Sequence, residues 1–208
     1  MFTLGAIATF QNLRPRSVTE ARRIVAEAHQ EGTIPVVLTL QQIDSIFMSS
    51  LIYSTAMTIA PVTANIEACE TDSVIIGGPD YEGRIPLAIG ESKSGDEITE
   101  QDVAHLKKVA DTLPSKRIAP YIIFSKTAVF APQIERCRGA QDPYHRRVIL
   151  LSVRELEPYF VYERTAKEFE IRPSAISLAD LASASRVFSL TLDPKCKGPQ
   201  AKRHNKAT

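Results

Sequence analysis

The sequence predicts an α/β protein with a mixed central sheet flanked by helices. Short apolar runs alternate along the 208-residue chain with segments whose apolar residues recur at three- and four-residue intervals. The apolar runs lack the polar alternation of half-exposed strands, which is typical of strands covered on both faces. Hydrophobic residues make up 44% of the chain, so one sizeable core is expected.

The first part of the chain is expected to contribute two helices and one strand. Residues 17–31 carry Ser17 and Glu20 in capping-box spacing, which predicts the start of a helix. Residues 34–40 (IPVVLTL) are expected to form a buried strand. Residues 41 to about 57 are expected to be helical, because their apolar residues are grouped at helical intervals.

The centre of the chain predicts a β-hairpin followed by a helix. Residues 72–76 (DSVII) and 85–91 (IPLAIGE) have the composition of strands, and the segment GGPDYEGR between them is typical of a turn. Thr99 is expected to cap a helix whose apolar face holds Val103 and Leu106. The remaining expectations are strands at 120–124 and 147–153, helices at 132–139 and 177–185, and a polar, basic, disordered tail at 193–208.

Composition favours a soluble, cytoplasmic protein without membrane contacts. No apolar run approaches the ~18 residues of a membrane span, and the N-terminal residues lack the features of a signal peptide. Cys69, Cys137 and Cys196 are too far apart for a disulfide framework or a CxxC metal site, and the first two are expected in or near the core. The sequence contains no motif of the P-loop, dinucleotide-binding, serine-hydrolase or zinc-protease classes.

Charge is unevenly distributed, although the net charge is only +1. Residues 1–66 have a net charge of 0, residues 67–112 of −7 and residues 113–208 of +8. An acidic centre followed by a basic half suits a protein whose centre binds cations and whose flank binds phosphates. A chance distribution of charges over solvated faces accounts for these values equally well.

Three charged side chains are expected to converge at the end of the hairpin. Glu91 and Lys93 are two residues apart in an extended chain, so their side chains point to the same face. If the turn is centred in GGPDYEGR, antiparallel pairing brings Asp72 opposite Glu91. The alternative aspartate, Asp80, falls at the far tip of the hairpin, roughly 20 Å away along the strand.

Two carboxylates at a strand end, with the carbonyl of Ser92 between them, suit a hard divalent cation such as Mg²⁺ or Mn²⁺. Asp72, Glu91 and Ser92 are therefore the expected metal ligands, and Lys93 would orient water and stabilise charge on a phosphate. A simple ion pair between Glu91 and Lys93 at a sheet edge, with Asp72 capping its strand, is an alternative of equal weight.

These residues carry a resemblance to a known family. Asp72, an interval of 18 residues, Glu91-Ser92-Lys93, a helix and the strand PYIIF together resemble the PD-(D/E)XK nuclease superfamily, whose fold is restriction-endonuclease-like. The resemblance covers about residues 67–159, and Thr71 stands where the name-giving proline would be.

The resemblance implies a restriction-endonuclease-like core and Mg²⁺-dependent hydrolysis of DNA phosphodiester bonds, in defence or repair. Asp72, Glu91 and Lys93 would then be the catalytic residues. The implied division of the chain is an N-terminal extension or subdomain at 1–60, a nuclease-like core at 61–175, and a C-terminal helix and tail at 176–208. A further metal-binding glutamate would be one of four candidates, which are Glu20, Glu27, Glu67 and Glu70.

A run of arginines with aromatic neighbours is the expected DNA-contacting edge. The segment IERCRGAQDPYHRR holds Arg136, Arg138, Arg146 and Arg147, and arginines among aromatic residues can bind a phosphate backbone and stack on bases. A polar loop between helix and strand is the alternative reading of this segment.

The sequence leaves open whether the protein is catalytically active and whether it forms a dimer. The alternative function is a catalytically inactive α/β domain that binds nucleic acid or another protein. Cleavage of both strands of a duplex would favour a two-fold homodimer.

Overall fold

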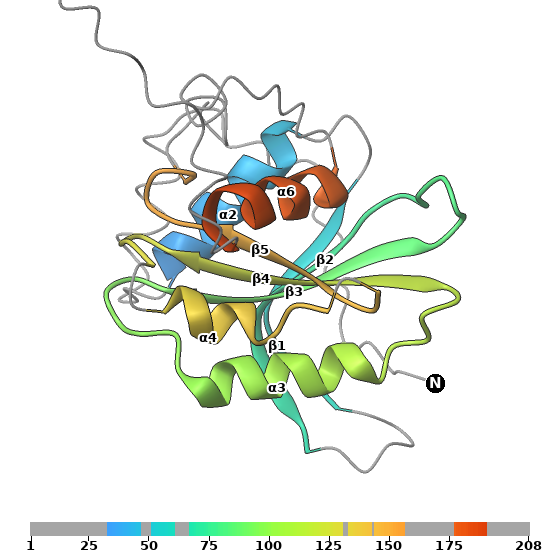
Figure 1. Ribbon diagram of the computed structural model, residues 1–208, viewed down its shortest axis with the longest axis horizontal. Coiled ribbons are helices and arrows are strands. Elements are labelled where there is room, and N and C mark those ends of the chain that lie inside the picture. Colours follow the sequence, from blue (N-terminus) through green and yellow to red (C-terminus); the bar gives the residue numbers. More distant parts are fainter. Residues whose placement is uncertain are drawn as a thin grey trace, which may run out of the picture.

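A computed structural model describes residues 33–46, 51–60, 67–130, 133–142, 144–156 and 177–190. These residues form one five-stranded mixed sheet in the order β1-β2-β3-β4-β5, with helices on both faces (Figure 1). The elements are α2 (Thr33–Ile46), β1 (Ile52–Ile59), β2 (Cys69–Ile76), β3 (Ile85–Lys93), α3 (Glu100–Asp111), β4 (Ile118–Lys126), α4 (Ile134–Arg138), β5 (Arg147–Leu151), α6 (Leu178–Ser185) and the π-helix η1 (Arg186–Leu190). Strands β1, β2 and β3 pair antiparallel, whereas β3, β4 and β5 pair parallel. The α/β class with a mixed sheet is confirmed.

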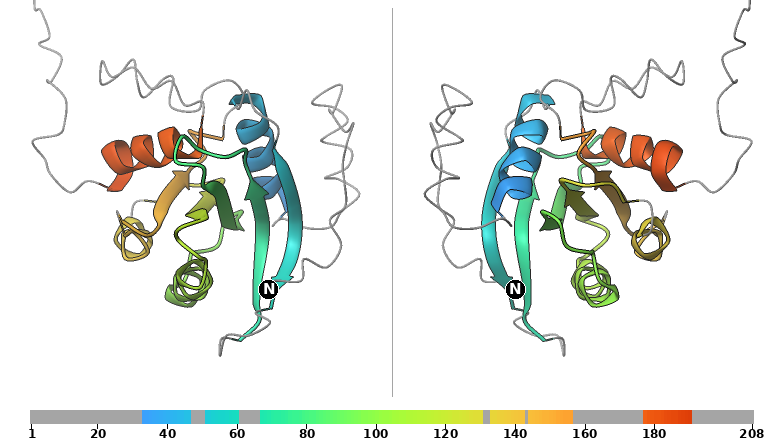
Figure 2. Two further views of the ribbon diagram at one scale, coloured as in Figure 1. Left: turned by 90° about the vertical axis from the view of Figure 1, so that its right-hand side faces the viewer. Right: turned by 90° about the vertical axis from the view of Figure 1, so that its left-hand side faces the viewer.

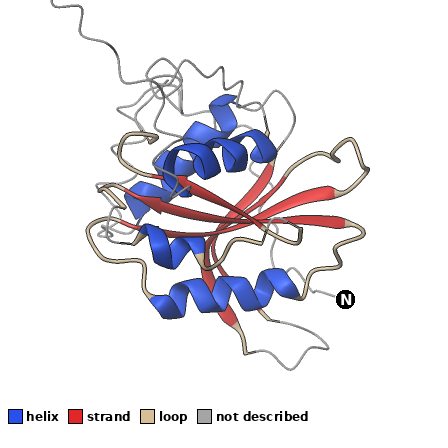
Figure 3. Cartoon of the chain, in the orientation of Figure 1, coloured by secondary structure: helices blue, strands red, loops and turns tan. Residues whose placement is uncertain are grey.

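The helices form two layers, one on each side of the sheet (Figures 2 and 3). Helices α3 and α4 cover one face, where Leu106 and Cys137 pack with Ile89, Ile122 and Leu150 from the strands. Helices α2 and α6 cover the other face. There the buried residues of the core are Ile43, Ile75, Ala88, Ile123, Ile149, Leu178 and Leu181. Two covered faces explain why the strand sequences are apolar without alternation.

The hairpin has the register that the sequence predicts. Ser73 pairs with Gly90 and Ile76 pairs with Leu87, so Asp72 lies opposite Glu91 at the end of the ladder. At the other end, the Asp80 carboxylate accepts hydrogen bonds from the backbone N–H groups of Glu82 and Arg84, both at 2.9 Å, and thereby closes the turn. Asp80 is a turn residue, as expected, because its side chain replaces missing backbone bonds.

Helix α3 also follows its sequence signals. The Thr99 side chain accepts from the backbone N–H of Asp102, and the Asp102 carboxylate accepts from the backbone N–H of Thr99 in return. The buried face of α3 consists of Val103, Leu106, Val109 and Ala110. Strands β4 and β5 and helices α4 and α6 lie within two residues of their expected limits.

The expected strand at residues 34–40 is wrong, because this segment belongs to helix α2. Buried positions in α2 include Thr39, Gln42 and Ile43, of which Gln42 donates a hydrogen bond to the carbonyl of Leu156. A short apolar run that is buried in a helix has the same composition as a covered strand, so periodicity cannot separate the two.

The expected helix at residues 41 to 57 is correct only up to Ile46, because residues 52–59 form strand β1. Strand β1 pairs with β2 along most of its length, from Ile52↔Ile76 to Ile59↔Cys69. Its β-branched and aromatic residues, such as Tyr53 and Thr58, suit a strand, and pairing with β2 decides the outcome over the helical spacing.

The expected boundary at residue 60 does not coincide with a break in the sheet. Strand β1 lies before it and pairs with β2 after it, and α2 contacts β3 and β4. Likewise α6 packs on β5 across the expected boundary at 175. The helix expected at 17–31 and the tail expected at 193–208 lie outside the described residues, as does Cys196. Cys69 and Cys137 are both buried, as expected.

None of the described helices has the length and apolarity needed to cross a membrane.

Candidate functional site

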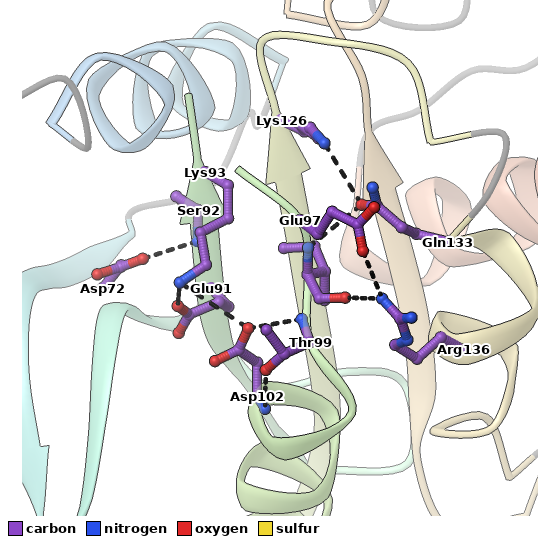
Figure 4. Close-up of polar contacts among 11 residues, drawn as sticks. Asp72, Glu91, Ser92, Lys93, Glu97, Thr99, Asp102, Lys126, Gln133 and Arg136 are labelled. Atoms are coloured by element: carbon purple, nitrogen blue, oxygen red, sulfur yellow. Dashed lines mark hydrogen bonds and ion pairs between the residues drawn. The ribbon is translucent and has the colours of Figure 1, made fainter. Parts of the chain in front are cut away.

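The site begins where strands β2 and β3 leave their regular pairing. The last ladder pair is Ser73↔Gly90; beyond it the Thr71 hydroxyl donates to the Gly90 carbonyl at 2.8 Å. The Asp72 carboxylate accepts the backbone N–H of Ser92 at 2.7 Å (Figure 4). Side chains of β2 therefore take over bonds that backbone groups would otherwise make, and the Asp72 carboxylate is held beside β3.

The backbone of Ser92 faces this same gap. In a strand the N–H and C=O of one residue point toward the same neighbour, so the Ser92 carbonyl is directed to the β2 side, past the last ladder pair. The Ser92 side chain points to the opposite face, where its hydroxyl lies 2.7 Å from that of Ser125. Of the groups of Ser92, only its carbonyl is thus left without a bond to the described residues near Asp72.

Glu91 and Lys93 stand side by side on the face covered by α3. The Lys93 ammonium is 2.6 Å from the Glu91 carboxylate, and both side chains are partly buried (26% and 14% exposed). Figure 4 shows Asp72, Glu91 and Lys93 from neighbouring strands gathered at this end of the sheet. The expected convergence of the three charged groups is therefore present.

A third carboxylate, that of Asp102, joins the group from the first turn of α3. It lies 3.8 Å from the Lys93 ammonium and accepts the N–H of Thr99 at 2.7 Å. Asp102 was not among the site residues expected from the sequence. The spacing Thr99-x-x-Asp102 was the available signal, because the third position of a capping box holds its side chain at the helix start.

Burial and like charges shape the protonation of these groups. Burial raises the pKa of Asp72, against the lowering effects of the Ser92 N–H and of Lys93. Burial also raises the pKa of Glu91, and the charge of Asp72 adds to that rise. Burial alone would lower the pKa of Lys93, but its contact with Glu91 and the charges of Asp102 and Asp72 raise it. The site thus holds crowded carboxylates around one firmly protonated ammonium.

The residues present fit a divalent cation with few protein ligands. One oxygen of Asp72 is used by Ser92 and one oxygen of Glu91 by Lys93; the second oxygen of each has no partner among the described residues. Within the described part of the chain, no three His, Cys, Asp or Glu side chains are grouped closely enough to hold a metal together. Two carboxylates and a carbonyl match a cation such as Mg²⁺, which retains several waters.

A second lysine lies at the same level of the sheet. Lys126 pairs in register with Lys93 on the neighbouring strand β4, is only 4% exposed, and contacts the Gln133 side chain at 3.5 Å. Gln133 in turn accepts the backbone N–H of Ile98. Lys126 and Gln133 therefore brace the loop between Lys93 and α3 (Figure 4).

The four arginines expected to bind DNA do not form one edge. Arg136 donates to the carbonyl of Ile98 at 2.5 Å and pairs with Glu97, beside the loop that follows Lys93. Arg138 donates to the carbonyl of Leu190 at 2.6 Å.

The other two arginines lie at the start of β5, at the opposite end of the parallel strands. Arg146 is 8% exposed and pairs with Asp111, and Arg147 lies against Tyr121. Helix α4 connects the end of β4 to the start of β5, so residues close in sequence are carried to opposite ends of the sheet.

Of the four candidates for a further metal-binding glutamate, Glu67 and Glu70 are described and both are exposed. Glu70 lies two residues before Asp72 on β2, and its negative charge contributes to the raised pKa of Asp72. Glu20 and Glu27 lie outside the described residues.

Searches of protein families, curated proteins and solved structures found no match to this chain.

Proposed function

We propose that the chain is a metal-dependent DNA nuclease, a hydrolase of phosphodiester bonds that acts in defence or repair. The observation that supports this most is the meeting of Asp72, Glu91 and Lys93 at one strand end, where burial raises the pKa of both carboxyl groups. Crowded, partly buried carboxylates destabilise a protein unless a ligand compensates them, so their presence argues for a function.

The division of roles follows from the contacts. Asp72, Glu91 and the Ser92 carbonyl would hold Mg²⁺ or Mn²⁺. Such an ion, when bound, neutralises charge on a scissile phosphate and lowers the pKa of a water molecule that it carries.

Lys93 would act on the phosphate as a cation. Its pKa is raised by Glu91 and by the charges of Asp102 and Asp72, so it is charged at neutral pH and cannot serve as a base. Because it is 26% exposed, its ammonium can contact a phosphate oxygen and stabilise the charge that develops there. Asp102 is a positioning residue in this scheme, since it contacts Lys93 from the first turn of α3.

The order of elements also supports a restriction-endonuclease-like core. A helix precedes the hairpin that bears Asp72 and Glu91, and a helix, a strand, a helix and a strand follow it. Strand β1 lies between that helix and the hairpin. This order, together with the Glu91-Ser92-Lys93 triplet, is the basis for proposing membership of the PD-(D/E)XK superfamily.

A catalytically inactive domain is the second candidate, and a specific observation favours it. The Glu91–Lys93 distance of 2.6 Å is that of a strong ion pair, which satisfies both groups without a metal. In that case the acidic cluster would only stabilise the junction of β3 and α3, and the protein would bind nucleic acid or another protein without cutting.

Incubation of supercoiled plasmid with the purified chain separates the two candidates. The nuclease proposal expects cleavage with Mg²⁺ or Mn²⁺, none with EDTA, and a loss of at least 100-fold in Lys93→Ala and Asp72→Asn. Glu82→Gln, in the exposed hairpin turn, is the matched control and should cut like the parent. Equal cutting by the parent and Lys93→Ala would contradict the role of Lys93 in phosphodiester hydrolysis.

Thermal denaturation supplies a readout that does not need the right DNA substrate. A metal bound to the folded chain raises the melting temperature, so Mg²⁺ or Mn²⁺ should stabilise the parent and leave Asp72→Asn unchanged. An inactive domain held by an ion pair should respond to neither ion.

A further inference from the structure

A cavity of about 200 Å³ lies at the end of the sheet opposite the acidic site. It surrounds the start of β4, where Ala119 and Tyr121 pair with Pro86 and Ala88 of β3. Those positions precede Lys93 by five residues or more, which separates the cavity from the acidic site by roughly 15 Å or more along the strands. The cavity is therefore a distinct site.

The charged residues that line the cavity are all basic. They are Arg84, Arg146 and Arg147; His145 also lines the cavity, and among the described residues no aspartate or glutamate contributes to the lining. Arginines that line a concave surface without carboxylates favour an oxyanion, because each guanidinium presents several N–H donors in a planar array.

Two of the arginines are fixed by carboxylates that lie outside the lining. Arg84 pairs with Glu82 at 2.7 Å and with Asp80 at 3.2 Å. Arg146 pairs with Asp111 and donates its Nε–H to the carbonyl of Ala140 at 2.6 Å. These contacts hold the guanidinium groups in place before any ligand arrives, which lowers the entropy cost of binding.

The third arginine, Arg147, has no carboxylate partner among the described residues. Its guanidinium lies 5.9 Å from the ring centre of Tyr121 and donates to the Tyr121 hydroxyl at 3.4 Å. The hydroxyl is an acceptor in that bond, so its own hydrogen remains available for a ligand. Burial raises the pKa of Tyr121, which keeps the phenol protonated at neutral pH. Arg147 and Tyr121 together offer a cation and a hydroxyl donor to one anion.

An aromatic ring stands at the rim of this cavity. Tyr144 is 90% exposed, and its backbone N–H is bound to the Asp142 carboxylate at 3.0 Å, which anchors the turn that carries the ring. An exposed ring beside a cationic pocket is suited to stacking on a nucleobase, which contributes about 1–3 kcal/mol per base.

We propose that this cavity binds the phosphate monoester of a nucleotide, with the phosphate against Arg147 and Tyr121 and the base against Tyr144. A monoester carries close to two negative charges at neutral pH, which matches a lining with several cations better than a singly charged diester does. The volume accommodates a phosphate and part of a sugar, so the base remains at the rim where Tyr144 lies. The proposal does not depend on nuclease activity at the acidic site.

Thermal denaturation and fluorescence anisotropy test this assignment. The probes are inorganic phosphate, deoxyadenosine monophosphate, deoxyadenosine, and one oligonucleotide with a 5′-phosphate or a 5′-hydroxyl end, all at matched ionic strength in EDTA. We expect deoxyadenosine monophosphate to raise the melting temperature and deoxyadenosine to have no effect. A free nucleotide is the source if the monophosphate binds at least as well as the oligonucleotide; a nucleic-acid end is the source if only the 5′-phosphorylated oligonucleotide binds.

Three variants make the test specific. Arg147→Gln should weaken binding of every phosphorylated probe by about tenfold or more. Tyr144→Ala should weaken the nucleotide but leave inorganic phosphate unchanged. Arg117→Gln removes an exposed arginine of the same region that does not line the cavity, and should bind like the parent. Equal binding by the parent and Arg147→Gln would overturn the proposal. So would no binding of any probe, or equal effects of deoxyadenosine monophosphate and deoxyadenosine together with equal binding of the 5′-phosphate and 5′-hydroxyl oligonucleotides.

Discussion

The carboxylate of Asp72 accepts the backbone N–H of Ser92 at 2.7 Å across the end of the β2–β3 hairpin. This bond fixes a negative charge beside the carboxylate of Glu91, whose pKa the charge of Asp72 helps to raise. The hairpin therefore holds together two groups that repel each other.

Asp72→Asn is expected to raise the melting temperature at pH 7 by a few degrees in the presence of EDTA. The pKa of Asp72 is raised by burial in the folded state, so the folded protein binds its proton more tightly than the unfolded chain does. The contribution of the protonated Asp72 carboxyl to the free energy of unfolding is therefore fully present at acid pH. It is lost as the pH rises through the raised pKa of Asp72. Asparagine can still accept the Ser92 N–H but carries no charge.

Melting curves of the parent and Asp72→Asn between pH 4 and 7 provide the measurement. The advantage of the variant should grow as the pH rises and be smallest at pH 4. A variant that is less stable than the parent at pH 7 would show that the aspartate charge stabilises the fold.

A double-mutant cycle of Glu91→Gln and Lys93→Met should give a coupling energy of about 1–3 kcal/mol. The two groups are 2.6 Å apart and partly buried, so removal of one leaves a charge that water only partly solvates. Lys93→Met should be the more destabilising single change, since it also leaves Asp102 without its cation.

The pair Arg84–Glu82 is a matched control for this cycle. Its atoms are 2.7 Å apart, but Glu82 is 48% exposed, so coupling below about 1 kcal/mol is expected. Urea denaturation measures both cycles. Equal coupling in the two pairs would mean that burial does not strengthen the ion pair of the site.

Asp102→Ala is expected to lower the free energy of unfolding by about 1 kcal/mol, because it removes one half of the capping box of α3. Asp102→Asn should cost less, since asparagine can still accept the Thr99 N–H while it removes the charge near Lys93. Gln101→Ala, at an exposed neighbouring position, is the neutral control. Identical urea midpoints for Asp102→Ala and Gln101→Ala would contradict a capping role.

Gly90→Ala is expected to destabilise the protein by about 1–3 kcal/mol through overpacking. A Cβ at Gly90 would lie 2.3 Å from the Ser73 hydroxyl oxygen, which is buried without a hydrogen-bond partner. Ser73→Ala should be neutral or stabilising by itself and should restore much of the loss in the double variant. Gly78→Ala meets no atom within 4 Å and serves as the control. Chemical denaturation of the four variants checks the expectation; an additive double variant would refute the clash.

Most of the hairpin was predictable because its signals are local. The turn segment GGPDYEGR sets the register, and the register sets which side chains meet, so the pairing that places Asp72 opposite Glu91 followed from counting residues. The cap of α3 was equally local, since Thr99 and Asp102 bond to each other's backbone.

The secondary structure expected from the sequence was wrong where contacts between residues far apart in the chain decide the structure. Residues 34–40 are apolar enough for either a strand or a buried helix, and packing of α2 on β3 and β4 selects the helix. The segment of β1 is a strand because β2 offers it pairing partners that lie 10 residues (Ile59↔Cys69) to 24 residues (Ile52↔Ile76) further along the chain, which no local pattern reveals.

For this chain, the sequence by itself determined the hairpin, its register, the helix that follows and the side-by-side placement of Glu91 and Lys93. Each depends on residues that are neighbours in the sequence or are joined by one short turn. Only the tertiary structure decided that Asp102 approaches Lys93 and that Arg136 and Arg147 lie at opposite ends of the sheet. Those relationships arise from the packing of α3 and from the crossover through α4, and packing depends on surfaces that are assembled only when the whole sheet forms.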